Sequence, residues 1–135
     1  ILSTPNVRES IAVGSRSDIA LLGIGTILNE NFSSLYQGGH ISRGTVADLR
    51  AAGAVGDVSG HHFDIYGSAS DTTFPNRIVG IAREDLLAVP IRFGAAGGLA
   101  KKEAILGALR GGYVNQLMID SSTAEAVLGL DKETI

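Results

Sequence analysis

The sequence predicts an α/β fold built around a doubly wound, mainly parallel sheet. Apolar runs with strand character alternate along the chain with helical patterns, and parallel strands need such crossover connections. Hydrophobic residues make up 44% of the 135 residues and aromatic residues 5%, which suits a core of small aliphatic side chains joined by turns rich in glycine. This length suits one domain, so we expect residues 1–135 to form a single unit.

The expected strands are apolar runs bounded by glycine or turn residues. The run Asp18–Gly25 is continuous, which is typical of a strand buried on both faces. The expected strands cover residues 18–25, 77–81, 91–95 and 114–119, with one extended stretch at 54–64, a loop at 28–39 and a turn at 66–71.

The expected helices are short and have recognisable ends. Ser42 is a candidate N-cap and Gly53 a stop signal, while Ser122 with Glu125 matches a capping box. Pro90 ends another helix. The expected helices cover residues 5–14, 43–52, 83–89 and 123–130, with a further helix whose first turn carries two lysines and which ends at Gly111–Gly112.

Composition excludes several functions. The net charge of −3 argues against nucleic-acid binding by this segment. The absence of cysteine excludes disulfides and thiolate metal sites, and fits a cytoplasmic protein. No apolar run approaches the ~18 residues of a membrane span, so we expect no membrane partner. The chain has no initiator Met, and we expect it to be a piece of a longer polypeptide.

The glycine turn before the lysine helix is the most informative motif. Gly97 and Gly98 precede the helix, so we expect unpaired N–H groups and the positive end of the helix dipole to attract an anion there. At ~100° per residue, Lys101 falls within the apolar arc of the helix, whereas Lys102 and Arg110 fall on the solvent side. A core-facing lysine needs an anion or must reach past the strand end. Lys101 is therefore the candidate ligand; the alternative is that it snorkels or pairs with a carboxylate.

Two further candidates follow expected strands. Asp57 stands in the glycine-containing string Gly56–Gly60, where a carboxylate can accept hydrogen bonds from a diol. An aspartate that bonds its own turn is equally consistent with this spacing. The string Gly23–Thr26 is not a dinucleotide fingerprint, because Leu28 replaces the third glycine. Gly25 can still bring the backbone close to a ligand.

We expect neither metal nor cofactor. His61 and His62 are adjacent, so on a strand they point to opposite faces, and His40 is the only other histidine. No Gly-x-Ser-x-Gly elbow marks a nucleophile, and the Gly97–Gly98 turn lacks the Gly-Lys-Ser/Thr of a nucleoside-triphosphate loop.

Six strings in order closely resemble the sugar-binding domain of SorC/DeoR-type bacterial transcriptional regulators. The resemblance runs over nearly the whole chain. The strings are Asp18–Gly25, Gly53–Asp57, Phe63–Asp64, Arg77–Ile81, Ala96–Ile105 and Gly111–Leu117. The resemblance implies a Rossmann-like fold related to sugar-phosphate isomerases and CoA transferases (NagB/RpiA-like), with this chain as the C-terminal portion of the effector domain. It also implies a phosphorylated sugar or related metabolite as effector, and a homo-oligomer that binds operator DNA through a helix-turn-helix domain absent from this chain.

The resemblance also implies roles for particular residues. In the family, the lysine of the Gly-Gly-x-x-Lys string contacts the effector's phosphate, and the acid of the Gly-Ala-Val-Gly-Asp/Glu string faces the sugar hydroxyls. These positions are Lys101 and Asp57 here. The expected effector-binding set is Lys101, Asp57, Gly97, Gly98, Gly25 and Gly56.

Two departures limit what the resemblance implies. We expect an upstream phosphate-binding loop of the family to lie outside this chain, and His61–His62 stands where many relatives have Gly-Arg-like residues. We expect a ligand sensor and not an enzyme. The alternatives are a sugar-phosphate isomerase-like enzyme with Asp57 as its base, and a purely structural assembly piece.

Overall fold

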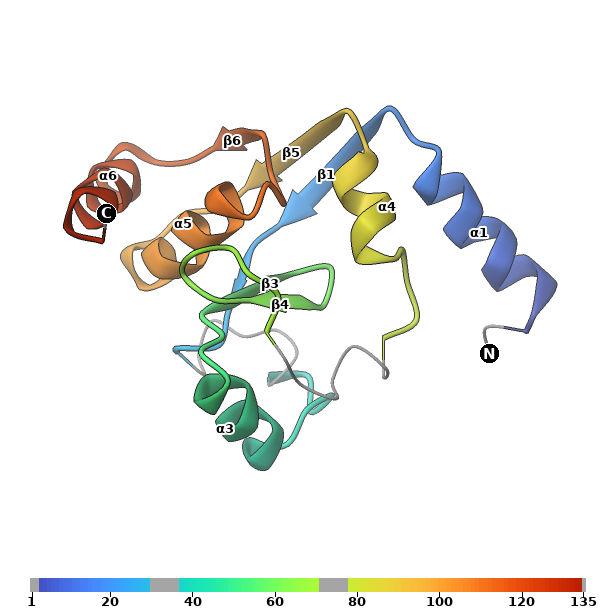
Figure 1. Cartoon of the computed structure of the whole chain (residues 1–135), viewed down its shortest axis with the longest axis horizontal. Coiled ribbons are helices and arrows are strands. Elements are labelled where there is room, and N and C mark those ends of the chain that lie inside the picture. Colours follow the sequence, from blue (N-terminus) through green and yellow to red (C-terminus); the bar gives the residue numbers. More distant parts are fainter. Residues whose placement is uncertain (1–2, 30–36, 71–77, 135) are drawn as a thin grey trace.

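The structure is a computed structural model that describes residues 3–29, 37–70 and 78–134. Its main sheet is parallel and has the strand order β1-β5-β6 (Figure 1), which confirms the expected fold class. These strands are β1 (Ile19–Gly23), β5 (Ile91–Ala95) and β6 (Gln116–Met118).

A second, antiparallel sheet was not predicted from the sequence. It contains β2 (Gly25–Thr26), β3 (Gly56–Val58) and β4 (His61–Phe63). The single extended stretch expected at 54–64 is wrong, because Ser59 and Gly60 both have positive φ angles, of 52° and 82°, and reverse the chain. Such a two-residue turn matches the twist of the strands that it joins.

The helices follow most of their sequence signals. Ser42 is the N-cap of its helix, since its Oγ accepts the Thr45 N–H at 3.1 Å. The capping box expected at Ser122 is wrong. Asp120 is the N-cap instead, because its Oδ1 accepts the Thr123 N–H at 2.9 Å and starts the helix earlier. The helices are α1 (Pro5–Ser15), α3 (Arg43–Ala51), α4 (Arg83–Ala88), α5 (Lys102–Arg110) and α6 (Ser121–Glu133), with a 3₁₀ turn, η3 (Leu99–Lys101), before α5.

Three other expectations fall at the edge of the described residues. The strand expected at 77–81 is wrong for residues 78–81, which have no strand pairing there, and Arg77 lies outside the described residues. Part of the loop expected at 28–39 and Asp71 of the expected turn also lie outside them. The rest of that turn is confirmed, with Asp64 Oδ1 accepting the N–H groups of Tyr66 and Ser68 at 2.9 Å each.

Helix α5 forms the centre of the main core. Ala104, Ile105 and Ala108 are fully buried, as the helical wheel predicts, and α5 packs against β3 and α6. The rings of Phe63 and Tyr113 lie beside it with their centroids 4.6 Å apart. This core fixes the position of η3 and its lysine relative to the antiparallel sheet.

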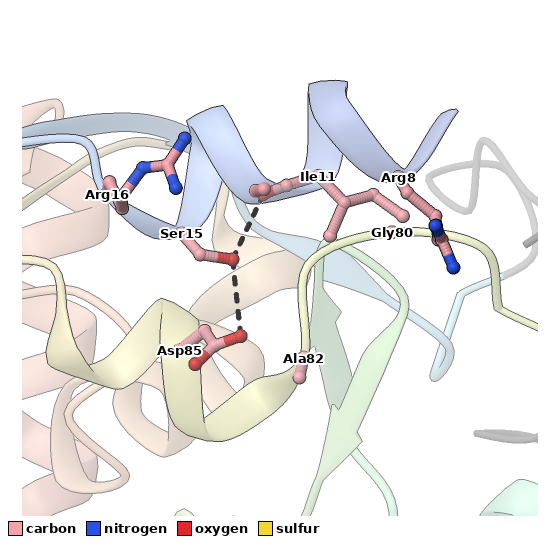
Figure 2. A pocket seen from close by; sticks show the side chains of 8 residues that line it. Arg8, Ile11, Ser15, Arg16, Gly80, Ala82 and Asp85 are labelled. Carbon is pink, nitrogen blue, oxygen red and sulfur yellow. Dashed lines mark hydrogen bonds between the residues drawn. The ribbon is translucent and has the colours of Figure 1, made fainter. Parts of the chain in front are cut away.

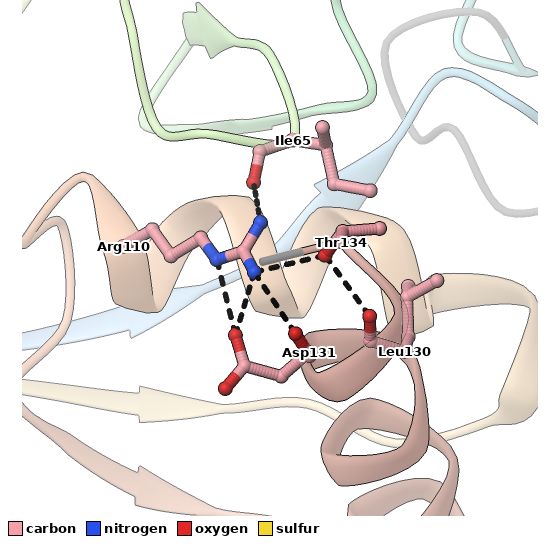
Figure 3. A network of polar contacts seen from close by, with 5 residues as sticks. All are labelled: Ile65, Arg110, Leu130, Asp131 and Thr134. Atoms are coloured by element: carbon pink, nitrogen blue, oxygen red, sulfur yellow. Dashed lines mark hydrogen bonds and ion pairs between the residues drawn. The ribbon is translucent and has the colours of Figure 1, made fainter.

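Arg110 at the end of α5 does not face solvent, so that expectation is wrong. Figure 3 shows its guanidinium between α6 and the loop that carries Ile65. One Nη lies 2.6 Å from Asp131 Oδ1 and donates to Thr134 Oγ1 at 2.8 Å. The other donates to the Ile65 carbonyl at 3.4 Å. The side chain thus joins two elements to α5.

Strand β1 is not buried on both faces within the described chain. Ile19 and Leu21 are 56% and 81% exposed, although Ala20 and Leu22 between them pack on the main core. The described helices therefore leave one side of β1 open. No helix among residues 3–29, 37–70 and 78–134 is long and apolar enough to cross a membrane.

Candidate functional site at the carboxyl edge of the parallel sheet

The three parallel strands end at one edge of their sheet, where open α/β sheets bind ligands. Strand β1 continues into Ile24 and Gly25, β5 into the Gly97–Gly98 turn, and β6 into Asp120. The parallel register thus brings to one edge segments that lie far apart in the sequence.

Lys101 reaches this edge from η3. Its Nζ donates a hydrogen bond to the carbonyl oxygen of Ile24 at 2.8 Å, directly after β1. Lys101 therefore snorkels to the strand end, as the alternative interpretation proposed. An ammonium group has three N–H donors, so this bond occupies one of them. Lys102 instead keeps a 40% exposed side chain with its Nζ 4.0 Å from Glu103 Oε1. The two adjacent lysines therefore face different surroundings.

Asp57 lies beside the peptide unit that joins Ile24 to Gly25. Gly25 pairs with Asp57 across β2 and β3, and a Cβ placed on Gly25 would lie 2.2 Å from Asp57 Oδ1. Only glycine leaves room for the carboxylate in this position. Asp57 Oδ2 accepts the Gly60 N–H at 3.1 Å, so the turn interpretation is confirmed. A carboxylate has further acceptor sites, so hydroxyl recognition stays a prediction.

Gly56 lets α5 approach the antiparallel sheet. A Cβ on Gly56 would lie 2.5 Å from the Ala104 Cβ and 2.5 Å from the Gly25 carbonyl oxygen. The glycine thus holds α5 against the strand pair that positions Asp57. Its structural role is clear, and direct contact with a ligand stays a prediction.

The Gly98 N–H of the Gly97–Gly98 turn is not an unpaired donor. The Gly98 N–H donates to Thr123 Oγ1 at 2.8 Å and to Asp120 Oδ2 at 3.2 Å. A Cβ on Gly97 would lie 2.7 Å from the same Asp120 oxygen. The expectation fails for Gly98 because a carboxylate of the chain itself already occupies the anion position.

Sequence reasoning missed Asp120 as a residue of this edge. Hydrogen bonds from the Ser122 hydroxyl, and then from Thr123 and Gly98, hold the pKa of Asp120 well below its usual range. It is therefore a carboxylate at neutral pH. Its position directly after an apolar strand and before a Ser-Ser-Thr run is the signal that could have found it.

His62 is a second neighbour of Asp57. The two residues pair across β3 and β4, so their side chains lie on the same face. Burial lowers the pKa of His62 because desolvation disfavours the imidazolium, although the charge of Asp57 acts in the opposite direction. His61 points the other way and contacts the Ile81 carbonyl oxygen through Nε2 at 2.9 Å. The two histidines are thus separated as predicted.

The arrangement combines a cation, a carboxylate and exposed backbone within one edge. Such a set can bind an anionic group and hydroxyl groups of the same small molecule. Among the described ranges, no group of three histidine or acidic side chains lies close enough to hold a metal ion.

A separate hollow of about 530 Å³ lies between α1 and the segment that leads into α4. Arg8 and Arg16 line it, and Figure 2 shows Ser15 opposite Asp85, with Oγ 3.2 Å from Oδ2. Helix α1 precedes β1, so this hollow belongs to the amino-terminal side of that strand and contains no predicted site residue.

The chain is similar in sequence and fold to known proteins. Residues 1–129 match the family model described as "Putative sugar-binding domain". The chain is 36% identical over 123 residues to the transcriptional regulator LsrR of Escherichia coli, covering 90% of this chain and 39% of LsrR. It thus spans about two fifths of the length of the curated relatives it matches.

Solved structures show the same relationship. Full-length SorC, the sorbitol operon regulator of Klebsiella pneumoniae, has a TM-score of 0.84 at 28% identity, with 94% of this chain and 41% of SorC covered. The putative sugar-binding domain of a transcriptional repressor from Vibrio fischeri has a TM-score of 0.84 at 28% identity, with 97% of this chain and 52% of that chain covered. The chain therefore belongs to the sugar-binding domain family of SorC/DeoR-type transcriptional regulators.

Proposed function

We propose that this chain binds a phosphorylated sugar at the carboxyl edge of the parallel sheet and thereby controls operator binding by the polypeptide that contains it. The observation that carries the proposal is the Ile24–Gly25 peptide unit. Lys101 bonds its carbonyl oxygen on one side, and the Asp57 carboxylate lies against Gly25 on the other. A phosphate group would pair with the ammonium, and sugar hydroxyls would donate to the carboxylate.

The position of Asp120 refines where the phosphate would bind. Its carboxylate already accepts the Gly98 N–H, so a phosphate at that N–H would meet a second negative charge. We therefore assign the phosphate to the Lys101 side of the turn. Gly97 and Gly98 contribute by allowing the backbone to fold around Asp120, and Gly56 by allowing α5 to approach.

His62 gives the sugar end a particular chemistry. At neutral pH its lowered pKa leaves a neutral imidazole next to Asp57. A neutral imidazole can donate one hydrogen bond and accept another, unlike a guanidinium, which only donates. We infer that His62 helps to select among sugars by their hydroxyl pattern.

The proposed mechanism is linkage between two binding equilibria. A sugar phosphate that binds one arrangement of an oligomer better than another shifts the population toward it. Operator affinity then changes by the same coupling factor that operator binding exerts on effector affinity. The DNA contact belongs to a helix-turn-helix domain outside this chain, and such a regulator would act in the cytoplasm.

The decisive experiment uses the full-length polypeptide and a panel of sugar phosphates with their unphosphorylated parents. Thermal stabilisation and calorimetric binding are measured together with product analysis of the incubated mixtures. We expect saturable binding of at least one sugar phosphate, weaker binding of its parent sugar and no conversion. Conversion of a bound sugar phosphate would support the isomerase-like alternative. Absence of binding across the panel would leave the structural assembly role.

A further inference from the structure

A short series of hydrogen bonds connects the first turn of α6 with the Lys101 ammonium. The Thr123 hydroxyl oxygen accepts the Gly98 N–H at 2.8 Å, and the Gly98 carbonyl oxygen accepts the Lys101 N–H at 2.9 Å. Gly98 is the residue before η3, and η3 ends at Lys101. The Lys101 side chain then donates to the Ile24 carbonyl oxygen at 2.8 Å. Contacts from α6 therefore extend through η3 to the end of β1.

The Thr123 hydroxyl has one orientation in this series. Thr123 is 0% exposed, so water does not compete for its hydroxyl. A hydroxyl has a single O–H donor and a carboxylate only accepts, so the bond of 2.7 Å to Asp120 Oδ2 takes the hydroxyl proton. The same oxygen then presents a lone pair to the Gly98 N–H. Asp120 is itself held, because its Oδ1 accepts the Ser122 hydroxyl at 2.6 Å. Asp120 therefore makes Thr123 an acceptor toward Gly98.

Gly98 depends on these bonds for its position. Its φ of 99° lies in a region that favours glycine, and glycine has the widest conformational freedom of any residue. Among the described residues, no atom lies within 4 Å of a Cβ placed on Gly98, so packing does not hold that side of it. Its N–H has two acceptors, and Thr123 Oγ1 at 2.8 Å is nearer than Asp120 Oδ2 at 3.2 Å. The Thr123 bond therefore sets the direction in which η3 leaves the turn.

The direction of η3 matters because Lys101 has a long and flexible side chain. Ordering a lysine side chain costs conformational entropy, and a side chain that is already held binds its partner with less of that cost. The bond from Nζ to Ile24 leaves two N–H donors on the ammonium. A shift of η3 moves the point from which Nζ reaches that carbonyl oxygen, and with it the two remaining donors.

We propose that Thr123 is a positioning residue for the anion site, because its hydroxyl fixes Gly98 and thereby the place of the Lys101 ammonium. The inference rests on the proposed function for the identity of the anion, a sugar phosphate. The position of Lys101 itself is measurable without any ligand. Thr123 does not touch the phosphate, since its buried hydroxyl already donates to Asp120 and accepts from Gly98.

Acylation of lysine amines by acetic anhydride in the full-length polypeptide measures how firmly Lys101 is held. The adjacent Lys102 is the internal reference, and fragmentation of the labelled peptide by mass spectrometry separates the two sites. In the unsubstituted polypeptide we expect Lys101 to react roughly 10-fold more slowly than Lys102, because its amine must first leave the Ile24 carbonyl. Thr123→Val removes the hydroxyl and keeps the shape of the side chain, so the rate at Lys101 should rise toward that of Lys102. Equal rates in the unsubstituted polypeptide, or a rate ratio that Thr123→Val does not change, would overturn the proposal.

Two control variants separate positioning from a general loosening of α6. Thr123→Ser keeps the hydroxyl and should retain the slow reaction of Lys101. Thr134→Val makes the same substitution at the opposite end of α6, where Thr134 Oγ1 accepts from Arg110 at 2.8 Å (Figure 3), and it should leave the rate ratio unchanged. Release of Lys101 in either control would contradict the role of the Thr123 hydroxyl. Thr123→Cys, whose thiol accepts only weakly, replaces Thr123→Val if the latter does not fold, and it too should release Lys101.

A second readout is the affinity for sugar phosphates and for the same sugars without phosphate. Thr123→Val should weaken binding of the phosphorylated sugar by roughly 3- to 10-fold and leave the affinity for the unphosphorylated sugar unchanged, as measured by calorimetric titration of the full-length polypeptide. Equal weakening of both would indicate a merely structural role and contradict the proposal. If the unsubstituted polypeptide binds no sugar phosphate, the proposed function fails, and the acylation rates alone decide whether Thr123 positions Lys101.

Discussion

Gly56→Ala tests how closely α5 approaches the strands that position Asp57. The new Cβ would lie 2.5 Å from both the Ala104 Cβ and the Gly25 carbonyl oxygen, roughly 0.9 Å inside the 3.4 Å limit of ordinary contact. Neither neighbour is the end of a flexible side chain, so α5 or β2 must move. Overpacking of this kind costs about 2–3 kcal/mol, and the melting temperature should fall by roughly 5–10 °C.

The melting temperature of Gly56→Ala is measured by scanning calorimetry, with Gly14→Ala as the matched control. Gly14 lies in α1 with nothing within 4 Å of an added Cβ, and alanine is favoured over glycine in a helix. The control should melt at or slightly above the parent temperature. If Gly56→Ala behaves like Gly14→Ala, the close packing that we derive for α5 is wrong.

Three further predictions concern charged groups. A carboxylate with a depressed pKa stabilises the fold above its unfolded pKa, so Asp120→Ala should lose less stability than the parent as pH falls below about 4. Acid unfolding of the variant that matches the parent would count against this role. The folded protein should lose stability as pH falls from 7 to 5, because the buried His62 imidazole, with a pKa below 6.5, resists protonation that the unfolded chain accepts, and His62→Gln should remove this loss. Urea unfolding at several pH values measures the free energy of unfolding, and the same dependence on pH in the variant and the parent would argue against the burial effect. Arg110→Met should lower the free energy of unfolding by about 1–2 kcal/mol, and Lys102→Ala by less than about 0.5 kcal/mol. Equal losses in urea unfolding would contradict the difference between the half-buried Arg110–Asp131 network and the exposed Lys102–Glu103 pair.

The sequence predicted the elements whose signals are local. Continuous apolar runs marked β1 and β5, and the serine cap at Ser42 needed only neighbouring residues. The helical wheel separated Lys101 from Lys102 correctly, although Lys101 lies in the 3₁₀ turn η3 and only Lys102 begins α5. Arg110 escaped it, since a wheel does not show that α6 folds back to supply Asp131.

The site contained features that no local pattern could reveal. Gly98 was predicted to offer an unpaired N–H, but Asp120, 22 residues further along the chain, caps α6 directly after the neighbouring strand β6 and accepts that N–H. The hairpin turn at Ser59 depends on a non-glycine residue with a positive φ angle, which residue type does not indicate. The predicted burial of β1 fails for Leu21 because the described residues supply a cover to one side only.

The proposed site assigns the phosphate of the effector to Lys101 and not to the adjacent Lys102. Calorimetric titration of two alanine variants tests that assignment most directly. Lys101→Ala and Lys102→Ala are titrated with the sugar phosphate that binds the full-length polypeptide and with its unphosphorylated parent. Loss of a charge-assisted bond is worth about 1.5–3 kcal/mol, so Lys101→Ala should weaken binding of the phosphorylated ligand by roughly 10- to 100-fold and leave the parent sugar nearly unaffected. Lys102→Ala should leave both affinities unchanged. Equal effects of the two substitutions on the phosphorylated ligand would contradict the assignment of its phosphate to Lys101.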